Sequence, residues 1–198
     1  MDNTTGRAKP LRAARVLTEV LAPTVLVSIY LLAQPFLVEG TTWLQAGVAV
    51  AFTTAIPFLA ILWFKRAGGV TDHHISRRSQ RFRPFLVAGV SLLVGVRVLR
   101  YLDAPEGLFL NLAAVFAGLV VCMVANLFWK LSVHSAVTAF VTLQLLSPLP
   151  YLGPAAIVAL CAAVGWSRVR MGHHTPAQVA AGFAIGAALH VWRVLFLA

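Results

Sequence analysis

The sequence predicts an all-α fold, a polytopic membrane bundle of six or seven transmembrane helices. The chain of 198 residues is 60% hydrophobic and only 11% charged, whereas an ordinary soluble domain is about one quarter charged. Its mean hydropathy is +0.84, and its apolar runs are long enough to cross a bilayer. We therefore expect a single transmembrane domain at 18–198, preceded by a basic cytoplasmic tail at 1–17.

The apolar runs define the expected helices in chain order. Five runs are long enough to span the membrane alone, at about 18–38, 42–64, 85–102, 107–129 and 177–197. The stretch 136–167 is also apolar, but it is interrupted by a cluster of prolines. Because such a cluster ends helices, we expect a hairpin of two shorter helices at about 136–149 and 154–168. The pattern GFAIG at 182–186 favours close helix packing.

The basic residues indicate the orientation. Alternating helices place three polar loops, 65–84, 130–135 and 169–176, on the side of the N-terminal tail, together with thirteen of the sixteen Lys and Arg residues. The positive-inside rule makes this side cytoplasmic, so we expect a multi-pass protein of the cell membrane. The net charge of +10 comes with no nucleic-acid-binding motif, and we expect membrane lipids rather than nucleic acid as partners. We expect no cleaved signal peptide, because no small-residue cleavage site follows a short apolar region.

The third polar loop concentrates cations beside the last helix. Within seven residues it carries Arg168, Arg170, His173 and His174. Thr175 resembles an N-cap and Pro176 a first helical residue, so the last helix is expected to begin just after His174. Gln178 then lies one turn beyond His174, where it can hydrogen-bond the histidine ring.

The other two loops add residues of the same kind. The first loop supplies Arg77 and Arg81, spaced i, i+4, and the second places Ser132 and His134 at a helix entrance. Guanidinium groups bind phosphate oxygens in a bidentate fork, and helix N-termini add backbone donors. Two histidines supply a nucleophile and a proton donor near neutral pH. Together these residues predict phosphoryl transfer that uses no metal and no other cofactor.

In its third loop the sequence resembles the type 2 phosphatidic acid phosphatase superfamily, whose integral-membrane members hydrolyse lipid phosphates without a metal. The third motif of that family is SR, five residues, H, three residues and D. It matches SRVRMGHHTPAQ at Ser167, Arg168 and His174, with Gln178 in place of the final acid.

The two other family motifs match less completely. The second motif, PSGH, is present as LSVH, which keeps Ser132 and His134. The first motif, K, six residues and RP, is the least similar, since Arg77 and Arg81 stand at a shorter spacing. The resemblance covers residues 72–178, and the apolar spans around the motifs fit the helical bundle of the family.

The resemblance implies a role for each matched residue. His174 would attack phosphorus and become a phosphohistidine, and His134 would protonate the leaving lipid oxygen and then activate water. Arg168 and the two arginines of the first loop would hold the nonbridging oxygens, to one of which Ser132 would donate its hydroxyl. Ser167 belongs with the phosphate-binding residues.

The glutamine departs from the family pattern. Gln178 can fix the tautomer of the histidine, but it lacks the charge of the aspartate. Asp72 is the only acid in the three loops and could compensate, and Lys130 and Arg170 are further supporting candidates. The expected substrate is a lipid phosphate, with polyprenyl and polyprenyl-sugar phosphates as candidates, hydrolysed as a monoester or a diphosphate.

Several alternatives remain open. The protein could bind a lipid phosphate with little catalysis, ionise a prenyl diphosphate in the same pocket, or be a structural membrane protein whose basic loops only meet headgroups. A metal site would draw on Asp72, His73, His74, His173 and His174. We do not expect one, because adjacent histidines seldom both reach one ion and the arginines would repel a cation.

Overall fold

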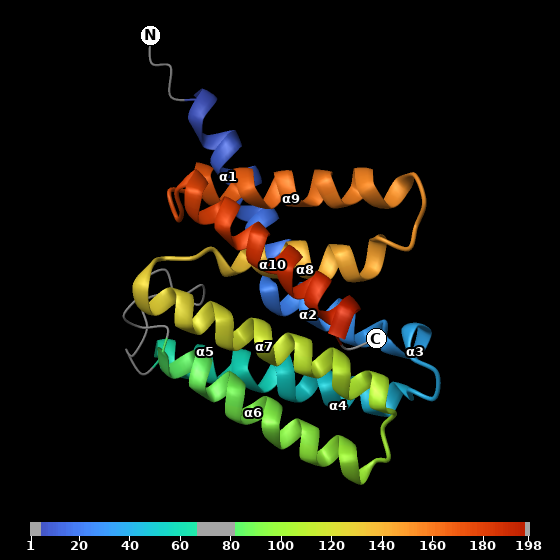
Figure 1. Ribbon diagram of the computed structural model, residues 1–198. Coiled ribbons are helices and arrows are strands. Elements are labelled where there is room, and N and C mark those ends of the chain that lie inside the picture. Colours follow the sequence, from blue (N-terminus) through green and yellow to red (C-terminus); the bar gives the residue numbers. More distant parts are fainter. Residues whose placement is uncertain (1–4, 67–81, 197–198) are drawn as a thin grey trace. The chain divides into compact units, whose positions relative to one another are not determined.

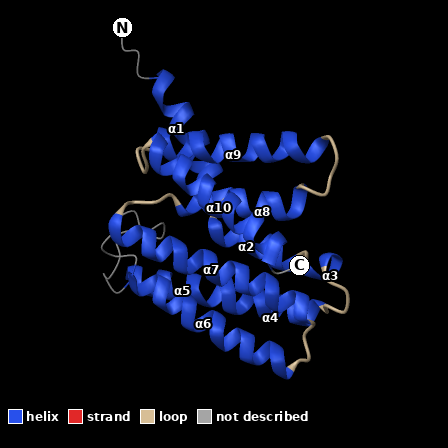
Figure 2. Cartoon of the chain, in the orientation of Figure 1, coloured by secondary structure: helices blue, strands red, loops and turns tan. Residues whose placement is uncertain are grey.

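The computed structural model describes residues 5–66 and 82–196, and every regular element among them is helical (Figure 2). This confirms the predicted all-α class. In chain order the elements are α1 (Thr5–Val20), α2 (Pro23–Leu32), α3 (Gln34–Leu37), α4 (Trp43–Val50), the π-helical segment η1 (Ala51–Ala55), α5 (Ile56–Arg66), α6 (Phe82–Tyr101), α7 (Glu106–Phe128), α8 (Val133–Leu146), α9 (Leu152–Arg170) and α10 (Pro176–Phe196).

Six segments of the described chain are long and apolar enough to cross a membrane, which fits a multi-pass membrane protein. They are Leu11–Leu32, Trp43–Phe64, Pro84–Tyr101, Glu106–Phe128, Leu152–Arg170 and Pro176–Phe196. The remaining apolar helix, α8, has 14 residues. At about 1.5 Å per residue it is roughly 21 Å long, less than the hydrocarbon core of about 30 Å.

The structure confirms the predicted hairpin and extends the first helix. α8 and α9 contact each other and are joined by the short proline-containing turn at 147–151 (Figure 1). The prolines therefore act as helix breakers, as expected. Of the segment 1–17 expected as a tail, the described part belongs to helix α1, and the first apolar span begins at Leu11.

The chain divides into two compact units. The first unit comprises residues 1–26 and 131–188, and the second comprises 27–130 and 189–198. The first unit therefore contains α1, α8, α9 and the larger part of α10. The expectation of one domain at 18–198 stays a prediction.

A chain of hydrogen bonds through two buried amides joins four helical segments of the second unit. Arg193 Nε donates to Asn111 Oδ1 at 3.0 Å, and Asn111 Nδ2 donates to Gln34 Oε1 at 2.6 Å. Gln34 Nε2 in turn donates to the carbonyl of Tyr30 at 3.0 Å. Polar bonds between helices replace the missing hydrophobic driving force inside a bilayer. We therefore assign these amides to packing of the second unit.

Two glycines bring α10 against α8 in the first unit. A Cβ on Gly182 would lie 2.6 Å from the carbonyl oxygen of Ser132 and 2.8 Å from Cβ of Ser135. A Cβ on Gly186, one turn further, would collide with the carbonyl of Ala136. Four residues apart, the glycines let the two backbones approach as in small-residue membrane packing. This confirms the packing role predicted for GFAIG.

Replacing Gly186 by leucine should destabilise the first unit, because the new side chain has no space against the α8 backbone. Overpacking costs about 1–3 kcal/mol, and we expect a correspondingly lower midpoint of thermal unfolding in detergent. The matched control is Gly47→Leu in α4, where an added Cβ meets nothing within 4 Å. Equal midpoints for Gly186→Leu and the control would contradict the close packing of α10 on α8.

Candidate functional site

The end of α9 is shaped by a Schellman motif. Gly172 has a φ of +67°, a left-handed conformation that a residue without Cβ adopts at little cost. The N–H of Gly172 donates to the carbonyl of Val169 at 2.9 Å, and the N–H of His173 donates to that of Arg168 at 3.1 Å. This pair of bonds defines the motif. The chain is thereby turned directly after Arg168 and Arg170, the two cations in the last turn of the helix.

α10 begins with a capping box. The Oγ1 of Thr175 accepts from the N–H of Gln178 at 3.3 Å, and the N–H of Thr175 donates to the Gln178 side-chain oxygen at 3.2 Å. Two N–H groups at the helix start are satisfied reciprocally. Pro176 occupies the first helical position, where a missing N–H costs nothing. The predicted helix start just after His174 is confirmed.

The same side-chain oxygen fixes the ring of His174. Nδ1 of His174 lies 3.2 Å from Oε1 of Gln178, which confirms the contact predicted from the spacing. Because the N–H of Thr175 donates to this atom, the atom must be the amide oxygen, which can only accept. Nδ1 of a neutral His174 therefore carries the proton, and the ring lone pair is on Nε2.

The entrance of α8 is attached to the same glutamine through its backbone. The N–H of Ser132 donates to the carbonyl of Gln178 at 3.4 Å. As the N-cap of α8, Ser132 accepts from the N–H of Ser135 at 3.4 Å and from its hydroxyl at 2.8 Å. The hydroxyl oxygen of Ser132 is the acceptor in both bonds, so neither bond uses its O–H group as a donor. His134, in the first turn of α8, is only 6% exposed.

Arg168 is the largest of the fully buried side chains among the described residues, with 2% of its surface exposed, and His174 is 7% exposed. The helix macrodipole favours a cation at the C-terminus of α9. Ser167, next to it, donates to the carbonyl of Val164 at 2.8 Å and accepts from the hydroxyl of Thr18 at 3.2 Å. The hydroxyl of Ser167 thus links α1 to α9.

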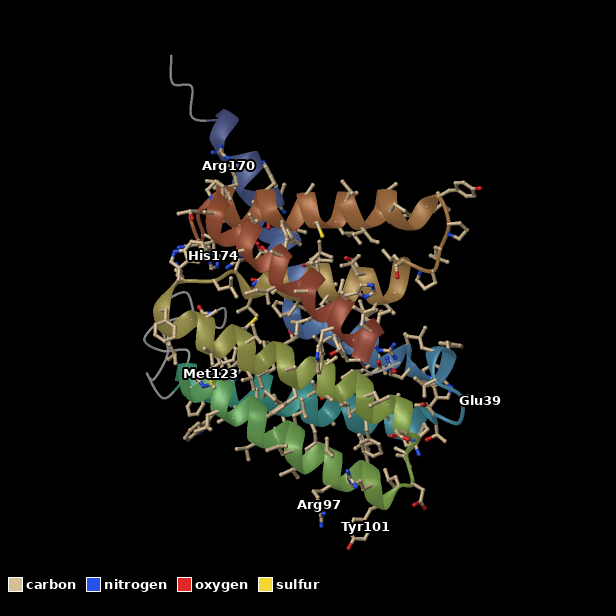
Figure 3. All side chains as sticks on the ribbon, in the orientation of Figure 1. Glu39, Arg97, Tyr101, Met123, Arg170 and His174 are labelled. Atoms are coloured by element: carbon tan, nitrogen blue, oxygen red, sulfur yellow. The ribbon has the colours of Figure 1, made fainter. Side chains whose placement is uncertain are left out.

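Besides Arg170, the first unit contains six of the residues predicted for the site. They are Ser132, His134, Ser167, Arg168, His174 and Gln178. Arg170 is exposed, and Figure 3 shows it at the same end of the first unit as His174. Lys130 belongs to the second unit and directly precedes the stretch 131–188 of the first unit in the sequence.

Three predicted site residues, Asp72, Arg77 and Arg81, lie outside the described residues, as do His73 and His74 of the metal alternative. The convergence of all three polar loops therefore stays a prediction. Among the described residues, no three His, Cys, Asp or Glu side chains are grouped so that they could hold a metal ion.

Sequence reasoning missed two features of the site. The first is the capping box itself, although the pattern T-x-x-Q at a helix start is its known signature. The second is Thr18, which is 1% exposed and bonds to a residue 149 positions away. A threonine within an apolar run hints at a polar helix contact, but it gives no indication of the partner.

Both charged residues in the stretch 131–188 are arginines. No Asp or Glu follows Glu106 in the sequence, so the stretch 131–188 contributes two arginines and three histidines and no carboxylate. Arg168 is buried, and a positive charge with little solvent exposure favours an anionic ligand. A buried guanidinium with its planar donors suits the oxygens of phosphate.

No protein-family model matches the chain, and no curated protein or solved structure matches it.

Proposed function

We propose that this protein is a metal-independent lipid phosphate phosphatase of the type 2 phosphatidic acid phosphatase kind, acting at the cytoplasmic face of the membrane. One observation carries the proposal. Gln178 holds the ring of His174 through its side chain and the α8 entrance, with Ser132 and His134, through its backbone. The buried Arg168 precedes this arrangement in a segment without carboxylates.

The proposed reaction has two steps. In the first, the Nε2 lone pair of His174 attacks phosphorus, the bond from phosphorus to the lipid oxygen breaks, and His134 gives its proton to that oxygen. The products are the lipid alcohol and a phosphohistidine. In the second, His134 takes a proton from water, the water oxygen attacks phosphorus, and the bond to His174 breaks. Inorganic phosphate leaves, and both histidines return to their starting states.

Arg168 and Ser132 act on the charge that moves during these steps. The guanidinium of Arg168 binds the nonbridging oxygens, and the O–H of Ser132 donates to one of them. Since phosphoryl transfer depends chiefly on positioning and charge stabilisation, fixed donors of this kind supply most of the catalysis. Arg77 and Arg81 are proposed as additional phosphate ligands from the first polar loop.

A lipid phosphate is the substrate class that the surroundings favour. The site residues lie at the end of α9 and at the starts of α8 and α10, and α9 and α10 are both apolar enough to span a bilayer. A phosphate bound there lies at headgroup depth, beside helices that can contact a hydrocarbon tail. Polyprenyl and polyprenyl-sugar phosphates are candidates within this class.

The identity of Gln178 favours a second candidate, a lipid-phosphate-binding protein with little catalysis. An amide orients His174 but adds no negative charge beside the ring as it becomes positively charged. The corresponding loss in a serine protease, where aspartate is replaced by asparagine, is about 10⁴-fold in rate. The two candidates differ in whether inorganic phosphate is released.

Replacing His174 by alanine should lower phosphate release at least about a hundredfold, because the nucleophile is lost. The measurement is inorganic phosphate released from a panel of lipid phosphates, in detergent, with and without EDTA. His173→Ala is the matched control, since it removes the adjacent ring from the same loop, and we expect it to stay active. Full activity of His174→Ala, or loss of activity with EDTA, would sink the proposed mechanism.

A series at position 178 tests the orientation of the nucleophile. Gln178→Leu removes the acceptor of the His174 ring, and we expect turnover to fall more than about tenfold, or 1.4 kcal/mol in the transition state. Gln178→Glu keeps the acceptor and adds charge, so turnover should be retained or raised.

Because Gln178→Leu also breaks the capping box, Thr175→Ala serves as the control for the lost cap. It removes one capping bond and leaves the bond between Gln178 and His174 in place. We expect Thr175→Ala to lower stability by about 1 kcal/mol with little change in turnover. Unchanged turnover in Gln178→Leu would mean that another group orients His174.

A further inference from the structure

An apolar groove with a volume of about 390 Å³ runs between the end of α9 and the start of α10. Both helices belong here to the first unit. The volume lies in the range of about 300–1,000 Å³ that is usual for small-molecule sites. The α9 wall includes Trp166 and Val169, and the α10 wall includes Val179, Ala180 and Phe183.

Gly165 brings the two walls together. A Cβ at this position would lie 3.2 Å from Val179 and 3.3 Å from Phe183, so the side chains of α10 pack directly on the α9 backbone. Trp166 and Val169, in contrast, are exposed at the groove. The floor is therefore closed by packing, while the opening lies on a surface that two membrane-spanning helices share.

Among the described residues that line the groove, Arg170 is the charged one. It lies one turn after Trp166, on the same face of α9, and in the last turn of the helix. Pro176 also lines the groove. Arg170 is the last residue of α9 and Pro176 is the first residue of α10, so these two residues flank the loop 171–175 that carries His174. An apolar groove with a single cation at one end complements an amphiphile with an apolar chain and an anionic head.

We propose that this groove is a docking subsite for the lipid phosphate substrate. The hydrocarbon chain lies between Trp166, Val169 and Ala180, and the phosphate pairs with Arg170 before it reaches His174. This inference rests on the proposed function, because it assigns the route of that substrate. It adds that the chain of the lipid, and not only its phosphate, is recognised.

Photo-crosslinking tests the subsite without requiring hydrolysis. The full-length protein in phosphatidylcholine nanodiscs is exposed to phosphatidic acid with a diazirine in one acyl chain, and labelled residues are located by mass spectrometry. We expect labels on the groove walls of α9 and α10. A phosphatidylcholine probe with the same chain should label them several-fold less, because it lacks the phosphate monoester that pairs with Arg170.

Three variants locate the effect. Ala180→Trp fills the groove from α10, and Arg170→Gln removes the charge. Val169→Trp fills the groove from α9, and it replaces Ala180→Trp if that variant does not fold. Each should lower phosphatidic acid labelling several-fold. Ala162→Trp, exposed on α9 but outside the groove, is the matched control and should not. Equal labelling by both probes, or labelling insensitive to these variants, would overturn the subsite and indicate ordinary contact with bilayer lipid.

Turnover separates failure of the subsite from failure of the proposed function. Ala180→Trp should raise KM about tenfold for a long-chain lipid phosphate, with kcat retained, and should not change KM for a short-chain, water-soluble one. Phosphate release with no effect of Ala180→Trp on labelling or KM would overturn the subsite alone. Selective labelling of the groove without any phosphate release would support the subsite and count against the phosphatase.

Discussion

The site depends on Gln178, which forms a capping box with Thr175 at the start of α10. The side-chain oxygen of Gln178 accepts from the N–H of Thr175 and from the ring of His174, while its backbone carbonyl accepts from Ser132. A helix cap contributes only about 1 kcal/mol to stability. Here, however, Gln178 also sets the tautomer of the His174 ring and bonds to the entrance of α8. One residue of a helix cap thus constrains the start of α10, the ring of His174 and the start of α8.

Close backbone packing is what allows this constraint to reach α8. Gly182 and Gly186 remove the side chains that would keep α10 away from α8. Within α8, the buried Thr138 and Thr142 donate their hydroxyls to carbonyls one turn earlier in the same helix. Both hydroxyls therefore have partners within α8 itself.

The features predictable from sequence were those with a local cause. Apolar length gave the membrane helices, prolines gave the hairpin of α8 and α9, and Thr175 with Pro176 gave the start of α10 and the contact between Gln178 and His174. Contacts between distant segments had no such signal. The bond from Thr18 to Ser167 and that from Ser132 to the Gln178 carbonyl depend on how helices pack, which a single sequence does not encode locally. Arg77 and Arg81 remain predictions because they lie outside the described residues.

The proposed function requires that the buried side chains of Arg168 and His174 bind a phosphate oxyanion together. A crystal or cryo-EM structure with tungstate, a dense phosphate mimic, tests it most directly. The account predicts tungstate within hydrogen-bonding distance of the Arg168 guanidinium and of Nε2 of His174, with the Gln178 contact to Nδ1 intact. Tungstate found only at exposed arginines such as Arg170, with Arg168 and His174 not in contact with it, would contradict the claim.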